Sequence, residues 1–212
     1  MDTLAMFSEI RSNLSMFKTS FDLAYINIFL PDEHMASSES LYFFPVSKLS
    51  DFQIPKEVLE NPGTSSVWFY QDLLSVPFLV NNSYHITNSV SCCRVLKHPD
   101  TDSIKYAYII YLDASEFSSI LQEIFHDNQI TSYILTDNGK IVASNNPSLL
   151  SASLDEEKLD FLYNKGDSLK KRAHTNYHTT TLRNGWLQVT EIPDSYIMQN
   201  THILIKSILL TI

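Results

Sequence analysis

Hydrophobic residues recur at two different spacings along the chain, and the spacing predicts which segments are helices and which are strands. At the start of the chain, within residues 1–21, large apolar residues follow one another at gaps of three and four, which is typical of one face of a helix. These residues are Phe7, Ile10, Leu14, Phe17 and Phe21. In residues 22–30 apolar side chains recur at every second position, which indicates a strand with one buried face.

The middle of the chain predicts a sheet followed by a helix. We expect strands at residues 67–70, 76–80, 84–96 and 104–112. The last of these is apolar on both faces, which favours a central position in the sheet. Residues 114–126 carry a single apolar stripe and therefore predict a helix, and Asp113 and Glu116 have the spacing of a capping box at its start.

The last third of the chain predicts a second, smaller unit. Residues 133–146 form a hairpin pattern in which Gly139 supplies the turn. A helix at 154–164, a basic polar stretch at 170–172, a threonine-rich strand at 177–182 and a final strand at 186–192 follow, and Pro193 starts a helix to the end of the chain. The predicted fold class is α+β, with two β-rich units between two helices.

Composition and charge exclude several functions. The 212 residues carry a net charge of −9, which disfavours nucleic acid as a partner of this chain. Only two cysteines occur, Cys92 and Cys93, and they are predicted to be free thiols in a strand without zinc-site spacing. His174 and His178 are expected on one face of a strand, too far apart to share a metal.

The sequence also lacks the patterns of enzymes and of cofactor sites. Its four glycines are too dispersed for a phosphate-binding loop, and no serine stands in a nucleophile context. We therefore expect no enzyme activity, no cofactor and no metal in this chain.

Two features bear on membranes. Residues 1–21 do not have the charge and hydropathy pattern of a signal peptide. Residues 203–212 are apolar, but they are about half the ~20 residues that a membrane span requires. They fit either an ordinary C-terminal helix or the start of a span, and we expect the span. The N-terminal helix either lies on its own domain or also pairs with a second copy of the chain.

The order of these elements resembles a double Cache sensor domain, in which a long N-terminal helix is followed by two PAS-like modules with antiparallel sheets. Three local features carry the resemblance: the strand at 104–113 with the helix at 117–125, the hairpin at 133–146, and Gly185 to Val189 followed by Ile192-Pro193. It implies an N-terminal helix, a membrane-distal module with its linking helix, a membrane-proximal module, and a C-terminal helix leading to the membrane. Their expected bounds are 1–21, 22–126, 127–193 and 194–212.

The resemblance implies the ligand-sensing part of a transmembrane signalling receptor. Such a domain lies on the extracytoplasmic side of the cell membrane, between two flanking spans, and drives a cytoplasmic output. The pattern is most similar to sensors of two-component histidine kinases. A membrane-anchored AraC-type regulator and a solute-binding module without a signalling role are the alternatives.

Within the family, the branch that binds amino acids has an Arg-x-Trp-Tyr element and an acidic residue at the end of the last distal strand. Here Trp68 and Asp113 match two of these positions, whereas Ser66 replaces the arginine and Phe69 the tyrosine. The missing guanidinium removes the bidentate partner of a ligand carboxylate, so an ordinary α-amino acid is disfavoured.

We therefore expect a sugar, an amine or another small polar compound as ligand. The residues expected to bind it are Trp68, Tyr70, Arg94, Tyr111 and Asp113. Each has a structural alternative: the aromatic side chains suit a core, Arg94 suits solvent, and Asp113 suits the cap of the following helix.

Overall fold

A computed structural model of the chain describes residues 3–20, 25–35, 42–52, 54–60, 66–75, 85–101, 103–164 and 168–209. The chain divides into two compact units, Met1–Ala114 and Ser115–Ile212. Each unit contains its own five-stranded sheet, in agreement with the predicted α+β class. The strand predicted at 76–80 lies outside the described residues. The finer division into four segments stays a prediction, and the contacts group most of the helix after Ala114 with the second unit.

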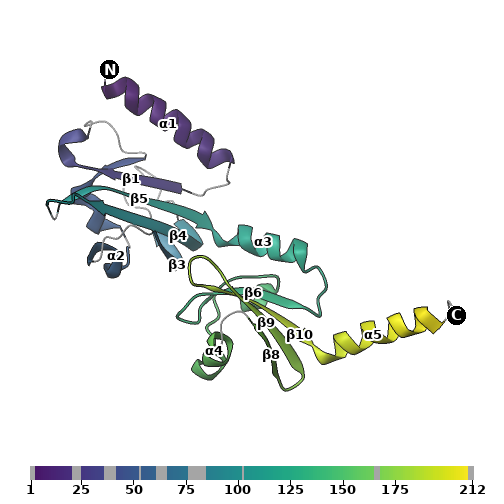
Figure 1. Cartoon of the computed structure of the whole chain (residues 1–212). Helices are drawn as coiled ribbons and strands as arrows, with labels where there is room; N and C mark the ends of the chain where they lie inside the picture. The colour runs from purple at the N-terminus through teal and green to yellow at the C-terminus, as the bar shows by residue number, and fades with distance from the viewer. Residues whose placement is uncertain are drawn as a thin grey trace. The chain divides into compact units, whose positions relative to one another are not determined.

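The first unit is a sheet with the strand order β2-β1-β5-β4-β3 (Figure 1). Only the β1–β2 pair is parallel among the strand pairs that the structure describes. β5 lies in the middle of the sheet, as its apolar pattern predicted. The elements are α1 (Thr3–Ser20), β1 (Tyr25–Leu30), β2 (Phe43–Pro45), α2 (Lys56–Glu60), β3 (Val67–Ser75), β4 (His85–Lys97) and β5 (Ile104–Asp113), with a 3-10 helix, η2 (Val46–Asp51), before α2.

The two faces of the first sheet have different neighbours. The inner face, as we call it, carries Phe29, Cys93 and Ile109, which form one core with Phe52 and Val58 from the segment of η2 and α2. The outer face carries the alternate residues of the same strands, and α1 lies over it (Figure 1). Because successive strand residues point to opposite faces, the strand register assigns every residue of β1, β4 and β5 to one face or the other.

The second unit has the strand order β7-β6-β10-β9-β8, and all of its neighbouring strands are antiparallel. α4 packs on this sheet through Leu162, which is fully buried among Tyr133, Leu135 and Val189. The elements are α3 (Ala114–Ile124), β6 (Thr131–Leu135), β7 (Ile141–Ser144), α4 (Glu156–Tyr163), β8 (Ser168–Arg172), β9 (Thr175–Thr181), β10 (Leu187–Pro193) and α5 (Asp194–Leu209). Among the described helices, none combines the length and the hydropathy that a membrane crossing requires.

Three sequence predictions about the second unit need correction. The basic stretch at 170–172 is part of a strand, β8, at the end of the sheet order, where lysine and arginine are common because they protect an unpaired edge. His174 lies in the turn between β8 and β9, so it does not share a strand face with His178. The final strand continues to Pro193, and α5 begins at Asp194.

The predicted hairpin is present as β6 and β7. Gly139 has a φ of +82°, and its amide donates to the Thr136 carbonyl at 3.0 Å. The Thr136 hydroxyl accepts from the Lys140 amide at 2.9 Å, which fixes the turn. The turn therefore depends on a residue that tolerates the left-handed region, as the sequence predicted.

Alanine at Gly139 is expected to destabilise the second unit more than alanine at Gly185. Both glycines have a positive φ, which costs an L-residue about 1 to 2 kcal/mol. A Cβ at Gly139 would also lie 3.4 Å from Leu159 Cδ2, whereas a Cβ at Gly185 meets nothing within 4 Å. Urea unfolding of the two variants measures the difference, and equal losses of unfolding free energy would show that the Leu159 contact is unimportant.

Candidate functional site

A group of buried polar residues lies on the inner face of the first sheet. Strand register places Tyr25 opposite Tyr111, and Tyr111 opposite Ser91. Asn27 is two residues from Tyr25 on β1, and Ser89 is two residues from Ser91 on β4, so both belong to the same face. Asn27, Ser89 and Ser91 are fully buried, and Tyr25 and Tyr111 nearly so. We call these five residues the inner polar cluster.

The hydrogen bonds of the inner polar cluster are incomplete. The Ser89 and Ser91 hydroxyl oxygens are 3.1 Å apart and bond to each other. The Asn27 amide is close enough to the Tyr25 phenol to lower its pKa through a weak polar contact, but neither amide atom makes a hydrogen bond of normal geometry with a described residue. An unsatisfied buried amide costs about 1 to 3 kcal/mol, so its retention at this position requires a reason.

The inner polar cluster is electrically neutral. Burial raises the pKa of the Tyr25 phenol from 10.0 to about 12, and burial also raises the pKa of Tyr111. Their rings are 6.3 Å apart at a tilt of 43°. Both phenols therefore keep their protons at neutral pH and can donate hydrogen bonds. Asp113, which is paired with Ser89, adds a carboxyl group to the same face next to the cluster. The cluster can bind hydroxyl, amide or amine groups.

The unfolding free energy is expected to fall as the pH rises from 9 to about 12. Burial raises the pKa of the Cys93 thiol from 9.0 to about 12 and that of Tyr25 from 10.0 to about 12. Below the ordinary pKa both states are protonated; above it the unfolded chain loses protons that the folded chain retains. Urea unfolding at stepped pH measures this loss. A Tyr25→Phe variant should lose less unfolding free energy over this pH range. An unchanged dependence of its unfolding free energy on pH would contradict the assignment of part of the loss to Tyr25.

The five residues predicted from the sequence are divided between the two faces of the sheet. Tyr111 and Asp113 lie on the inner face. Trp68, Tyr70 and Arg94 belong to the outer face, where they are in register with Cys92, Val90 and Tyr108 respectively. The sheet therefore separates the two groups, and they cannot line one pocket on a single face. All three outer residues are partly buried.

The outer group has its own polar contacts. The Tyr70 hydroxyl donates to Asn88 Oδ1 at 2.7 Å, and the Ser66 and Tyr108 hydroxyls are 3.1 Å apart. Arg94 Nε is buried without a hydrogen-bond partner in the described part of the chain. Of the predicted set, Arg94 is the residue whose side chain contains a fully buried polar atom without a hydrogen-bond partner among the described residues.

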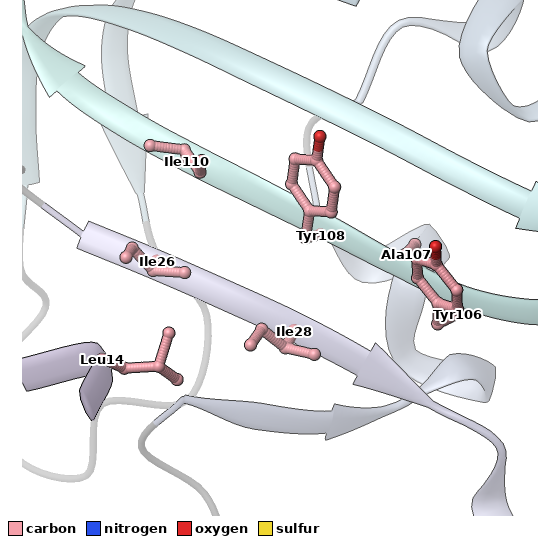
Figure 2. A pocket seen from close by; sticks show the side chains of 7 residues that line it. All are labelled: Leu14, Ile26, Ile28, Tyr106, Ala107, Tyr108 and Ile110. Atoms are coloured by element: carbon pink, nitrogen blue, oxygen red, sulfur yellow. The ribbon is translucent and has the colours of Figure 1, made fainter. Parts of the chain in front are cut away.

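A pocket of about 310 Å³ also lies on the outer face, beneath α1 (Figure 2). It has an apolar lining and contains none of the five predicted residues. Leu14 of α1 reaches towards Ile26 and Ile28, while the hydroxyls of Tyr106 and Tyr108 point away from Leu14 (Figure 2). The pocket is thus separated by the sheet from the inner polar cluster.

Sequence reasoning missed Asn27, Ser89 and Ser91. A signal for each was present. Asn27 interrupts the apolar strand Tyr-Ile-Asn-Ile-Phe-Leu, and the two serines alternate with Val90 and Cys92, so that both face one way. Polar residues on the buried face of a strand are uncommon, and their alignment across neighbouring strands indicates a site. Within the described residues, no group of three or more His, Cys, Asp or Glu side chains could hold a metal.

Comparisons with known proteins show the fold. No family model and no curated protein matches the sequence. The periplasmic sensory domain of the Campylobacter jejuni chemoreceptor Tlp1 is similar in structure, with a TM-score of 0.53 at 8% identity over 79% of this chain and 62% of that chain. The extracellular domain of the putative histidine kinase rpHK1S-Z16 has a TM-score of 0.51 at 11% identity, over 92% of this chain and 89% of that chain.

An extracellular ligand binding receptor from Desulfohalobium retbaense is also similar, with a TM-score of 0.48 at 9% identity over 69% of this chain. This chain spans only 25% of that receptor's length. Together, the two stronger likenesses show that the chain shares its fold with a periplasmic sensory domain and with an extracellular domain of a histidine kinase.

Proposed function

We propose that this chain is the extracytoplasmic sensor domain, of double Cache type, of a transmembrane signalling receptor. The observation that carries the proposal is the inner polar cluster: a fold found in sensory domains contains, in its first unit, a buried amide whose hydrogen bonds are unmet within the described residues. A bound ligand would supply those bonds, and this explains why the destabilising amide is retained.

The chemistry of the cluster favours an uncharged or cationic small polar ligand. Asn27, Ser89 and Ser91 offer hydroxyl and amide groups, and the protonated phenols of Tyr25 and Tyr111 are donors. Asp113 would pair with a ligand amine. The five residues of the cluster include no lysine or arginine that would clamp a carboxylate, so a sugar or an amine fits better than an α-amino acid.

The receptor would respond by a shift in population. A ligand that binds one arrangement of the first unit more tightly favours that arrangement. The change would reach the output through α5, which leads towards a membrane span, and a second copy would pair through α1. A two-component histidine kinase is the proposed receptor type; a membrane-anchored AraC-type regulator would use the same sensor.

A thermal-shift screen tests ligand binding. The purified chain is heated with sugars, amines, amino acids and carboxylates, and we expect a sugar or an amine to raise the unfolding midpoint. A rise of roughly 2 to 3 kcal/mol in unfolding free energy corresponds to a ligand at a hundred times its dissociation constant. A response to carboxylates alone would overturn the ligand class, and no response to any compound would overturn the sensor proposal.

The complete gene separates the receptor from a solute-binding module. The proposal expects a membrane span on each side of this chain and a cytoplasmic output domain after the second span. A gene that encodes a secreted protein without an output domain would exclude the receptor and favour the solute-binding module.

A further inference from the structure

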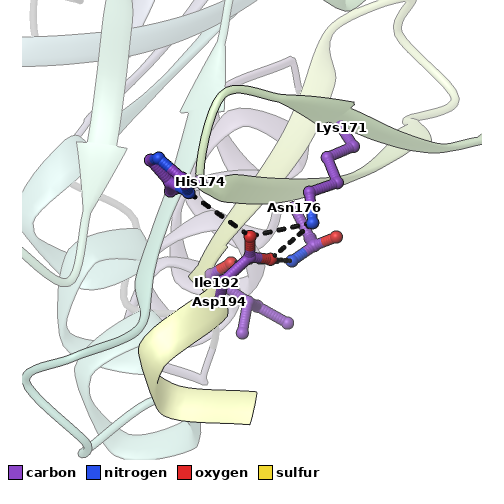
Figure 3. Close-up of polar contacts among 5 residues, drawn as sticks. All are labelled: Lys171, His174, Asn176, Ile192 and Asp194. Carbon is purple, nitrogen blue, oxygen red and sulfur yellow. Dashed lines mark hydrogen bonds and ion pairs between the residues drawn. The ribbon is translucent and has the colours of Figure 1, made fainter. Parts of the chain in front are cut away.

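The turn between β8 and β9 holds the first residue of α5. The Asp194 carboxylate accepts from Lys171 Nζ at 2.9 Å and from Asn176 Nδ2 at 2.8 Å, and its second oxygen lies 2.8 Å from the same lysine. His174 Nδ1 is 3.8 Å away. The Asp194 amide donates to the His174 carbonyl at 2.8 Å. Figure 3 shows these groups converging on Asp194 from the hairpin.

The same hairpin stores strain at its tip. Ala173, the first of its two turn residues, has a φ of +52°, a region that favours glycine. Such a conformation costs an L-residue about 1 to 2 kcal/mol and persists only where the surrounding structure enforces it. The pairing of β8 with β9 on both sides of this two-residue turn holds that conformation, and the bonds to Asp194 come from residues on both sides of the same turn.

Beyond Tyr196, which is half-buried, the described side chains of α5 have little contact with the unit. Ile197 is 44% exposed and Met198 is 59% exposed, and the next three residues are also exposed. A helix that is held at one end and whose described side chains beyond Tyr196 are exposed takes its direction from the attachment. Glu191, three residues before Asp194, is held separately by Tyr133 and Lys158, at 2.7 and 2.9 Å.

We infer that Lys171, Asn176 and Asp194 form a clamp that makes the β8–β9 hairpin and α5 move as one body, and that this clamp sets the direction in which α5 leaves the second unit. In the receptor, a displacement of the hairpin would then become a displacement of the output helix. This last step rests on the proposed function, whereas the clamp itself does not.

Distance measurements between two spin labels test the clamp. One label is attached at Thr201→Cys on α5 and the other at Arg183→Cys in the turn between β9 and β10, both of which are exposed. Cys92 and Cys93 are buried, which directs the label to the introduced thiols. The clamp variant is Lys171→Met with Asn176→Ala. The matched control is Arg172→Met, which removes the neighbouring cation and its 2.7 Å ion pair with Glu157.

We expect a narrow distance distribution in the parent and in the Arg172→Met control, and a width that roughly doubles in the clamp variant, because α5 then samples several directions. Asp194→Asn keeps the size of the side chain and should broaden the distribution as well. This single substitution decides the matter if the double variant does not fold. An unchanged width in Asp194→Asn, or equal broadening in Arg172→Met, would overturn the clamp.

The label experiment requires no ligand. A failed ligand screen would therefore remove the proposed function and leave the clamp in place. An unchanged distance distribution would remove the clamp and leave the proposed ligand site in the first unit untouched.

Discussion

Replacing Asn27 by leucine is expected to abolish the ligand-induced thermal shift while making the ligand-free chain more stable. Leucine has nearly the shape of asparagine but no polar atoms. The Asn27 side chain is fully buried, and neither amide atom is hydrogen-bonded within the described residues. Its removal should raise the unfolding free energy by about 1 to 3 kcal/mol, the usual cost of an unsatisfied buried group. Urea unfolding and the ligand screen measure the two effects on the same protein.

The Asn27→Leu substitution should change stability and ligand binding in opposite directions, which separates a binding role of Asn27 from a structural one. Replacing a residue that only supports the core lowers the unfolding free energy of the protein. Replacing a binding residue that is unfavourable in the ligand-free protein raises the unfolding free energy and weakens binding. If Asn27→Leu destabilises the chain, the amide has a structural partner and does not mark a ligand site.

Trp68→Ala is the matched test of the other face. Trp68 lies on the outer face with Tyr70 and Arg94, in register with Cys92. If the ligand binds the inner polar cluster, this variant keeps the full ligand-induced shift after correction for its own stability. Loss of the shift in Trp68→Ala, with the shift retained in Asn27→Leu, would move the site to the outer face and support the outer residues predicted from the sequence.

The division of the predicted site shows what one sequence can and cannot determine. Alternation along a single strand is visible in the sequence, and it puts Trp68 and Tyr70, which are two positions apart, on the same face, in agreement with their register. The sequence does not show which face of one strand lies beside which face of the next, because that depends on the register in which the strands pair. A one-residue change in the pairing of β4 with β5 would bring Arg94 to the same face as Tyr111. The residues of the candidate site could therefore be identified only from the strand pairing together with the alternation along each strand.

The errors in the second unit have a similar physical origin. β8 was missed because its sequence, Ser-Leu-Lys-Lys-Arg, is charged and lacks an apolar alternation. Such a strand forms because its backbone pairs with β9 and its cations find tertiary partners, including Asp194 and Glu157. By contrast, the hairpin around Gly139 was predictable because its turn chemistry is local. Local signals were reliable, and features that depend on distant partners were not.

The largest loss of stability is expected from truncation of the two cores, and each loss should stay within its own unit. Phe29 is fully buried and packs edge to face on Phe52 at 4.8 Å, so Phe29→Ala should cost about 3 to 5 kcal/mol in the first unit. Leu162 is equally buried in the second core, and Leu162→Ala should cost about 2 to 5 kcal/mol there. The buried residues of the two cores have no member in common.

Amide hydrogen exchange, followed residue by residue, separates the two effects because it reports local unfolding. Phe29→Ala should accelerate exchange in β1, β4 and β5, and Leu162→Ala in β6, β9 and β10. Leu169→Ala is the control, since Leu169 is 74% exposed and its loss should change the unfolding free energy by no more than about 0.5 kcal/mol. Equal acceleration in both units after either substitution would mean that they unfold as one cooperative body. In the proposed receptor, a signal from the first unit would then reach α5 through global stability, and a local displacement of the hairpin would not be needed.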